Sequence, residues 1–313
     1  MEVRGRKLHF GVQLQAQRTD WAGYARAVRA VEELGFGSVW TFDHMLPFAG
    51  PDDGSCFETL TTMGALALLT ERVRIGALVN GVLYRDPATL AKAAAQVDRM
   101  TGGRLDFSLG AAWAEREFRA YGLGFPSLAE RYGRLEEALE VVTALWSAPR
   151  TTLSGRYYRL DDAPCEPKPV QVPLPVTVGG SGLGSLRVAA RFAHRLNLIG
   201  GPGYCAQRWA RFGQLCAERG RDAAEVELSV HPVLAVAATG AGAHELASRL
   251  GASNSGQPGE PGEGWLTGTP DAVVAQIRRY TDIGVSHFVF ALPPPFELAH
   301  LRLFVQEVAP AFQ

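Results

Sequence analysis

Hydrophobic residues in this chain alternate between short, dense runs and longer stretches in which they recur every three or four positions. The short runs are typical of buried strands, and the longer stretches are typical of amphipathic helices. In the first half, strands are predicted at Leu8–Leu14, Gly37–Phe42, Val73–Val79 and Arg104–Leu109. The helices predicted between them are Trp21–Leu34, Phe57–Leu69 and Pro87–Met100. This spacing indicates successive βα units.

The second half continues the alternation after a long predicted helix, Leu128–Trp146, and a small predicted hairpin, Thr151–Leu160. Further strands are predicted at Val176–Val178, Arg195–Ile199, Val226–Val236 and His287–Leu292. Helices are predicted at Ser185–Ala193, Tyr204–Arg219, Ala243–Leu250, Thr269–Ile283 and Glu297–Ala309. Eight strands without a linker of domain size favour a closed (β/α)8 TIM barrel over an open doubly wound sheet. We therefore expect residues 1–313 to form a single α/β barrel domain with a hairpin insertion.

A segment rich in glycine and proline, Gly251–Gly264, follows the seventh predicted strand. Its composition does not support a packed element. Chain order places it on the C-terminal face of the barrel, where barrel enzymes have their active sites. We expect it to act as a mobile lid that orders when substrate or cofactor binds; the alternative is a passive surface loop.

Composition narrows the possible partners. The 31 basic and 32 acidic residues nearly cancel, and no basic stripe occurs, so neither nucleic acid nor a membrane surface is an expected partner. No run of 18 apolar residues occurs, so no membrane span is expected. The N-terminus lacks the apolar core of a secretory signal. Four scattered cysteines suit reduced thiols, so we expect a cytoplasmic protein that binds a small molecule.

One strand-to-helix turn carries the strongest local signal. The predicted strand Val176–Val178 leads into Gly179, Gly180, Ser181 and Gly182, and a helix follows at once. Glycine leaves the backbone amides accessible, and a helix N-terminus carries partial positive charge. The turn therefore suits a phosphate group, although similar turns often bind nothing.

Two other strands end in polar residues that would face the same mouth of the barrel. Asp43 and His44 follow the second strand; histidine titrates near neutrality, and the carboxylate accepts hydrogen bonds. Asn80 follows the third strand and offers an amide to a ring carbonyl. Each has a structural alternative, such as a turn cap or an ordinary strand end.

The fourth strand ends in small residues, Gly110, Ala111 and Ala112, which leave room for a bulky group. Glu115 would place a carboxylate over the same mouth, whereas we expect Trp113 to belong to the core. Together, the strand ends describe a pocket for a flat molecule that bears a phosphate.

Other chemistries lack their motifs. Metal-ligand spacings such as HxH and HExxH are absent, so no metal site is expected. Ser181 has no nucleophile-elbow context, and the glycines at 179, 180 and 182 form neither a P-loop nor a dinucleotide fingerprint.

An ordered set of segments resembles the bacterial luciferase-like monooxygenase superfamily, in particular its branch that uses the deazaflavin coenzyme F420. The matching segments are Glu33–Pro47, Glu71–Val79, Tyr84–Pro87, Gly102–Asp106, Pro167–Gln171, Gly179–Gly182 and Leu266–Pro270. As a set, they are specific and run nearly from end to end.

The resemblance implies a (β/α)8 barrel that binds F420 or reduced FMN at its C-terminal face, usually as a homodimer. It implies that Asp43 and His44 lie beside the ring. It also implies that a non-prolyl cis peptide within Ala77–Val79, with Leu78–Val79 as the first choice, supports the ring. Gly179–Gly182 match the loop that holds the phosphate tail. Glu115 matches an acidic residue near the ring.

The resemblance predicts an F420-dependent oxidoreductase in which His44 or Glu115 handles the proton of a hydride transfer. A monooxygenase using reduced FMN and O₂ is the alternative, and a flavin-binding protein without turnover is a further one. The chain departs from the family at His194–Arg195, where relatives often have Asp-Gly, and at the leucine that follows, where they often have tryptophan. This departure leaves the pocket wall near the sixth strand open.

Overall fold

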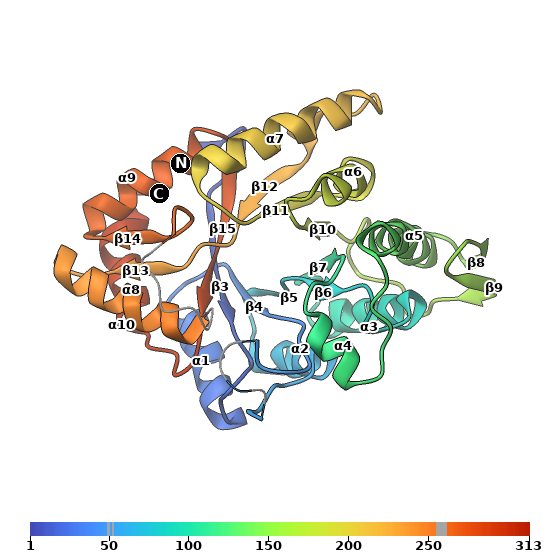
Figure 1. The fold of residues 1–313 in the computed structure, drawn as a ribbon, viewed down its shortest axis with the longest axis horizontal. Coiled ribbons are helices and arrows are strands. Elements are labelled where there is room, and N and C mark those ends of the chain that lie inside the picture. Colours follow the sequence, from blue (N-terminus) through green and yellow to red (C-terminus); the bar gives the residue numbers. More distant parts are fainter. Residues whose placement is uncertain (49–50, 52, 255–261) are drawn as a thin grey trace.

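The computed structural model describes residues 1–48, 51, 53–254 and 262–313. Within them, eight parallel strands form a closed barrel, because β10 pairs with β7 on one side and with β11 on the other. The barrel strands are β3 (His9–Leu14), β4 (Ser38–Thr41), β5 (Arg74–Ala77), β7 (Leu105–Gly110), β10 (Val176–Gly179), β11 (Arg195–Leu198), β12 (Glu227–Val230) and β15 (Val285–Leu292). The predicted (β/α)8 fold is confirmed (Figure 1).

Helices surround the barrel and begin close to their predicted starts. They are α1 (Trp21–Glu33), α2 (Thr59–Leu69), α3 (Pro87–Met100), α5 (Leu128–Ser147), α6 (Leu183–Phe192), α7 (Pro202–Ala217), α9 (Pro270–Thr281) and α10 (Ala299–Leu303). In α3, the Asp86 carboxylate accepts a hydrogen bond from the Ala88 amide, and Pro87 occupies the first turn, where its missing N–H is not needed.

Most buried apolar side chains of the barrel and the inner helix faces form one large core, and two smaller clusters of the described residues lie apart from it. The large core extends from Val12 near the N-terminus to Phe312 near the C-terminus. Every residue of β15 is buried, as expected for a parallel strand covered on both faces. None of the described helices combines the length and the apolar character needed to cross a bilayer.

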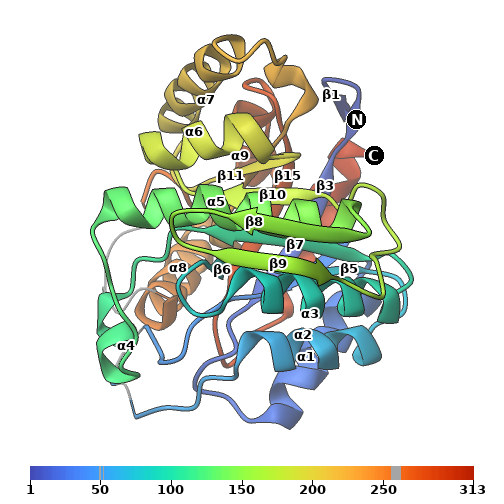
Figure 2. The ribbon, with the colours of Figure 1, turned by 90° about the vertical axis from the view of Figure 1, so that its right-hand side faces the viewer.

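The predicted hairpin is present as β8 (Arg150–Ser154) and β9 (Arg159–Pro164). It lies outside the barrel, beside α5 (Figures 1 and 2). Short strands β1 (Glu2–Val3) and β2 (Arg6–Lys7) pair at the N-terminus, and β6 (Asn80–Gly81) pairs with β7 at the barrel mouth. Neither these short strands nor the helix α4 (Glu115–Ala120) was expected from the sequence.

The seventh predicted strand, Val226–Val236, is two strands in the structure. Barrel strand β12 ends at Val230, and β13 (Leu234–Val236) instead pairs in parallel with β14 (Leu266–Gly268). Pro232 lies between them, and a proline has no N–H to continue a ladder of hydrogen bonds.

The predicted loop Gly251–Gly264 is also shorter than expected at its start. Helix α8 (Gly240–Asn254) extends through its first four residues, so the helix ends four residues beyond the predicted Leu250. Residues 255–261 lie outside the described residues, and the predicted lid is therefore not tested.

A cluster of charged side chains is buried at the N-terminal end of the barrel. Arg195 lies 2.6 Å from the Glu227 carboxylate and 3.5 Å from that of Asp106, which also accepts a 2.9 Å hydrogen bond from Arg74. His194 accepts a hydrogen bond from the Val176 amide at the same end. The departure at His194–Arg195 therefore changes the end of the barrel opposite the predicted site.

Candidate active site

A cavity of about 380 Å³ opens where the barrel strands end. It is lined from β4, β5, β7, β10, β11 and β12, and by residues at the start of α5 and α6. Of the residues predicted from the sequence, those that line it are Asp43, His44, Leu78, Val79, Gly110, Ala111, Ala112, Gly179, Gly180, Ser181 and Gly182. The structure thus brings most of the predicted strand ends into one cavity.

The side chain of Val79 forms the middle of one wall. A methyl group placed at Gly110 or at Gly179 would come within 2.6 Å of the Val79 methyls, so both positions have space only for glycine. The peptide bond Leu78–Val79 is cis, as the family resemblance predicted. Three strand ends therefore meet closely around one apolar side chain, and this wall suits the face of a planar ring.

His44 is held by a carboxylate that the sequence analysis did not select. Its Nδ1 lies 2.5 Å from Oε1 of Glu117, whose Oε2 accepts hydrogen bonds from the Met45 amide at 2.6 Å and the Tyr84 hydroxyl at 2.9 Å. Burial tends to raise the pKa of Glu117, but these donors outweigh it and hold that pKa below its ordinary value.

Glu115, the carboxylate predicted to act at the mouth, does not join this group. It is the first residue of α4 and forms an exposed i, i+4 ion pair with Arg119 at 2.8 Å. Two residues along a helix differ by about 200° in direction, so Glu115 faces solvent while Glu117 faces inward. The structure therefore places Glu117, and not Glu115, beside His44.

Asp43 and Asn80 are occupied by contacts within the protein. The Asp43 carboxylate accepts two hydrogen bonds from Arg85, at 2.8 and 3.1 Å, and a third from the Gly81 amide at 2.8 Å. Asn80 is buried and donates to the Ser108 carbonyl; it does not line the cavity. Asp43 thus fixes the loop after β5, and Asn80 fixes β6 against β7.

The opposite end of the cavity has the features of an anion site. Gly180, Ser181 and Gly182 line it at the start of α6, and none of the described side chains caps the N-terminus of that helix. Arg131 and Tyr132 of α5 also line the cavity, and a methyl group at Gly182 would come within 2.5 Å of the Tyr132 hydroxyl. The Arg131 guanidinium donates through Nη1 to the Pro126 carbonyl at 3.0 Å, and its buried Nε has no hydrogen-bond partner among the described residues. Uncapped amides, a helix dipole and an arginine suit a phosphate group.

The outer rim of the cavity is apolar. Trp113 is 66% exposed and packs edge-on against His44, with ring centroids 5.4 Å apart, so the expectation that it belongs to the core was wrong. Leu128 and Ile199 extend this rim. His231 lines the cavity at the end of β12, and the described structure gives its buried Nε2 no partner.

Comparisons with known proteins agree with this geometry. The family model of luciferase-like monooxygenases matches residues 7–263. The chain belongs to this family. An F420-dependent glucose-6-phosphate dehydrogenase of Microbacterium testaceum (strain StLB037) is 30% identical to this chain. The alignment covers 89% of this chain and 90% of the relative.

Two solved structures share the fold of this luciferase-like chain. The F420-dependent tetrahydromethanopterin reductase of Methanopyrus kandleri has a TM-score of 0.84 at 18% identity and covers 98% of this chain and 100% of its own. A riboflavin lyase solved with modified FMN has a TM-score of 0.79 at 16% identity and covers 98% and 91%. The family recognised from the sequence is confirmed.

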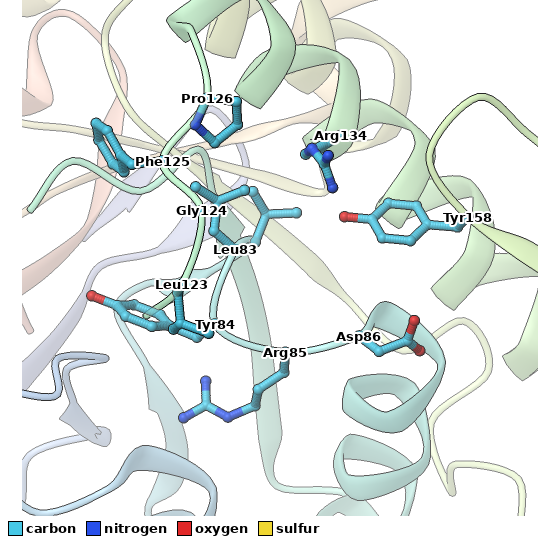
Figure 3. Close-up of a pocket in the computed structure, with 11 residues that line it drawn as sticks. Leu83, Tyr84, Arg85, Asp86, Leu123, Gly124, Phe125, Pro126, Arg134 and Tyr158 are labelled. Atoms are coloured by element: carbon cyan, nitrogen blue, oxygen red, sulfur yellow. The ribbon is translucent and has the colours of Figure 1, made fainter. Parts of the chain in front are cut away.

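A second groove of this luciferase-like barrel lies on the other side of Tyr84 (Figure 3). Two arginines line it, and both are paired: Arg85 with Asp43, and Arg134 with Glu130 at 2.8 Å. The Tyr158 hydroxyl points toward Arg134.

In the described part of the chain, no group of three or more histidine, cysteine or acidic side chains is arranged to hold a metal ion.

Proposed function

We propose that this protein is an oxidoreductase that uses coenzyme F420 to transfer a hydride to or from a small organic substrate. The observation that carries the proposal is that one cavity contains two features. The first is the uncapped start of α6 at Gly180–Gly182, which we call the phosphate cradle, and the second is His44, which is held by the Glu117 carboxylate. Support also comes from a 30% identical relative that is named as F420-dependent.

The cofactor fits the residues that are present. Its phosphate would lie against the amides of Gly180–Gly182 and the Arg131 side chain, whose buried Nε has no partner in the described part of the chain. Its ring would lie along the wall formed by Val79 between Gly110 and Gly179. When bound, the deazaflavin supplies or accepts a hydride at C5 of its ring.

His44 would carry the proton of the reaction. Since Nδ1 lies against Glu117, the other ring nitrogen, Nε2, is the atom that receives a proton from a substrate hydroxyl or returns it to a carbonyl. Glu117 is then a positioning residue, because its carboxylate holds the imidazole in one orientation.

Two alternatives share the same cavity. A monooxygenase that uses reduced FMN and O₂ would need the same cradle and ring wall, and a flavin-binding protein without turnover would need no proton carrier. The hydrogen bond between His44 and Glu117 favours a catalytic role over the second alternative.

Titration of the pure protein with F420, reduced F420, FMN and reduced FMN tests the proposal. We expect F420 to bind at micromolar concentrations, and Ser181→Asp to weaken it at least ~30-fold, about 2 kcal/mol, by placing a carboxylate in the cradle. Gly180 is a poorer site for this test, because its φ of 122° would strain any side chain. Ser154→Asp on the exposed hairpin is the matched control. FMN binding without F420 binding would contradict the proposal.

We further propose a homodimer formed through α2. This surface helix contains no charged residue, and its outer stripe is Thr61, Gly64, Ala65 and Leu68, the last 79% exposed. A helix without a polar outer face is typical of one that is covered by a partner.

We also propose that residues 1–313 form one domain and that the protein is cytoplasmic, since its four cysteines are free thiols.

A further inference from the structure

We propose that the substrate is an uncharged, largely apolar alcohol or carbonyl compound rather than a sugar phosphate. This inference rests on the proposed hydride transfer and specifies the chemistry of the molecule that meets the ring. It separates this chain from the relatives named as glucose-6-phosphate dehydrogenases.

The cavity holds the positive charge for one anion and not for two. Among the described residues that line it, Arg131 is the one arginine or lysine, and it precedes Tyr132, which packs against Gly182. The residues that are not described, 49, 50, 52 and 255–261, include no arginine or lysine in the sequence. Once the phosphate of the cofactor occupies the cradle, a phosphorylated substrate has no cation to pair with. An unpaired buried anion is strongly disfavoured.

The charged groups near His44 would add to this penalty. The carboxylates of Asp43 and Glu117 lie at this end, and Arg85 is already bound to Asp43 by two hydrogen bonds. Arg119 is paired with Glu115 on the surface. A second phosphate would therefore meet carboxylates whose counter-ions are taken.

The rim beyond the ring wall instead exposes large apolar side chains. Trp113, Leu128 and Ile199 are 66%, 50% and 62% exposed, and all three line this cavity. Exposed apolar side chains that converge on one pocket are typical of a surface that an apolar ligand covers. Burial of an apolar substrate against them would gain the usual hydrophobic free energy.

His231 also lines this cavity and supplies a single polar contact. Its Nε2 is buried without a partner in the described structure, and burial lowers the pKa of this histidine to about 4, so the ring is neutral at pH 7. A neutral imidazole offers one hydrogen bond, which suits a hydroxyl or carbonyl oxygen and does not compensate a dianion.

The reaction is balanced with these groups. In the oxidising direction, the carbinol C–H bond breaks and its hydride passes to the oxidised cofactor. The O–H proton passes to Nε2 of His44, and the carbon–oxygen double bond forms. The reverse reaction reduces a ketone or aldehyde with the reduced cofactor and the same proton.

The experiment uses the F420-loaded protein with three probes: cyclohexanol, glucose and glucose 6-phosphate. Binding is measured by calorimetry, and turnover by loss of the deazaflavin absorbance. We expect cyclohexanol to bind and be oxidised with saturation, and glucose 6-phosphate to show neither. Trp113→Ala and Ile199→Lys should weaken cyclohexanol binding at least ~10-fold, because they remove apolar area or add an ammonium group to the rim. The affinity for F420 should change less than ~2-fold.

Val172→Ala is the matched control, since Val172 is 91% exposed and precedes β10 on the opposite face. Saturable binding of glucose 6-phosphate to the loaded protein would overturn the inference while leaving the F420 proposal intact. Unchanged cyclohexanol binding in both rim variants would also overturn it. Failure of F420 itself to bind would instead refute the proposed function, and this inference with it.

Discussion

The Glu117 carboxylate collects three donors and leaves none of its oxygens unused: the His44 ring, the Met45 amide and the Tyr84 hydroxyl. Glu117→Gln keeps the size of the side chain but removes its charge and its second acceptor oxygen. The imidazolium form of His44 then loses its counter-charge, so we expect kcat to fall by roughly 10²-fold with a small change in KM. Steady-state kinetics that determine kcat and KM separately would show this difference.

Glu115→Gln is the comparison variant for this prediction. Glu115 is on the surface and its ion pair with Arg119 is exposed, so its replacement should leave kcat unchanged. If Glu115→Gln reproduced the loss and Glu117→Gln did not, the role given to Glu117 would be wrong.

At the residue scale, the sequence allowed prediction of the groups that follow barrel strands directly. His44 and Gly179–Gly182 could be selected because residues that follow a barrel strand directly must lie at the C-terminal face of the barrel. Glu117 was missed because the choice between it and Glu115 depends on where α4 begins, and no cap or hydrophobic period marks that start. Trp113 was misplaced because aromatic residues are usually buried, and only the loop geometry exposes this one.

At the element scale, α2 makes the proposed homodimer testable. Leu68→Glu places a charge in the middle of its uncharged outer stripe, and a charge buried in an apolar interface is costly. We expect a wild-type dimer by light scattering after size-exclusion chromatography and a largely monomeric variant. The barrel should remain folded by circular dichroism.

Val172→Glu is the control for this change, because Val172 is at least as exposed but lies outside α2. A wild-type monomer, or a Leu68→Glu dimer as stable as the wild type, would refute the interface.

The success of prediction at this scale depends on how local the signal is. Strands such as β15 carry a continuous apolar run, and helix starts such as Asp86-Pro87 carry their own cap, so both could be predicted. The pairing of β13 with β14 joins segments about 30 residues apart, and hydrophobic pattern alone contains no such information. Pro232 marks the end of β12 in the sequence itself, because a proline has no N–H to continue a strand ladder.

At the scale of the whole molecule, buried neutral histidines predict how stability depends on pH. Burial lowers the pKa of His287 from 6.5 to about 3, and those of His231 and His300 to about 4. The unfolded chain then binds more protons than the folded one below pH 6.5, so stability falls as the pH decreases from 6.5 toward 4. Each histidine contributes up to about 1.4 kcal/mol per pH unit in this window.

We expect the Tm to decrease steadily from pH 7 to pH 4.5 in scanning calorimetry. His300→Gln should make that decrease shallower, because the variant lacks one of the protonating groups. Depressed carboxyl pKa values, such as that of Glu58 at about 2, act below pH 4.5 and do not explain a loss above it. A Tm that stayed constant from pH 7 to pH 4.5 would contradict the prediction.

The complete barrel could be predicted because strands and helices alternate along the chain and chain order fixes the neighbours of each strand. Closure is a different matter: the pairing of β7 with β10 spans the hairpin and α5, and that of β3 with β15 joins the two ends of the chain. A count of eight units indicated closure indirectly, through the number of strands at which a barrel fills with side chains.

The buried charges at the N-terminal end of the barrel are a place where protein engineering could increase the stability of this protein. A buried cluster of charges such as Arg74, Arg195, Asp106 and Glu227 is usually less stable than well-packed apolar residues of the same shape, whereas loss of one partner alone is costly. Replacement of the whole cluster at once can therefore add stability far from the catalytic end. Most mutations that reshape a binding rim reduce stability, so a barrel strengthened in this way would tolerate more of them during directed evolution toward new substrates.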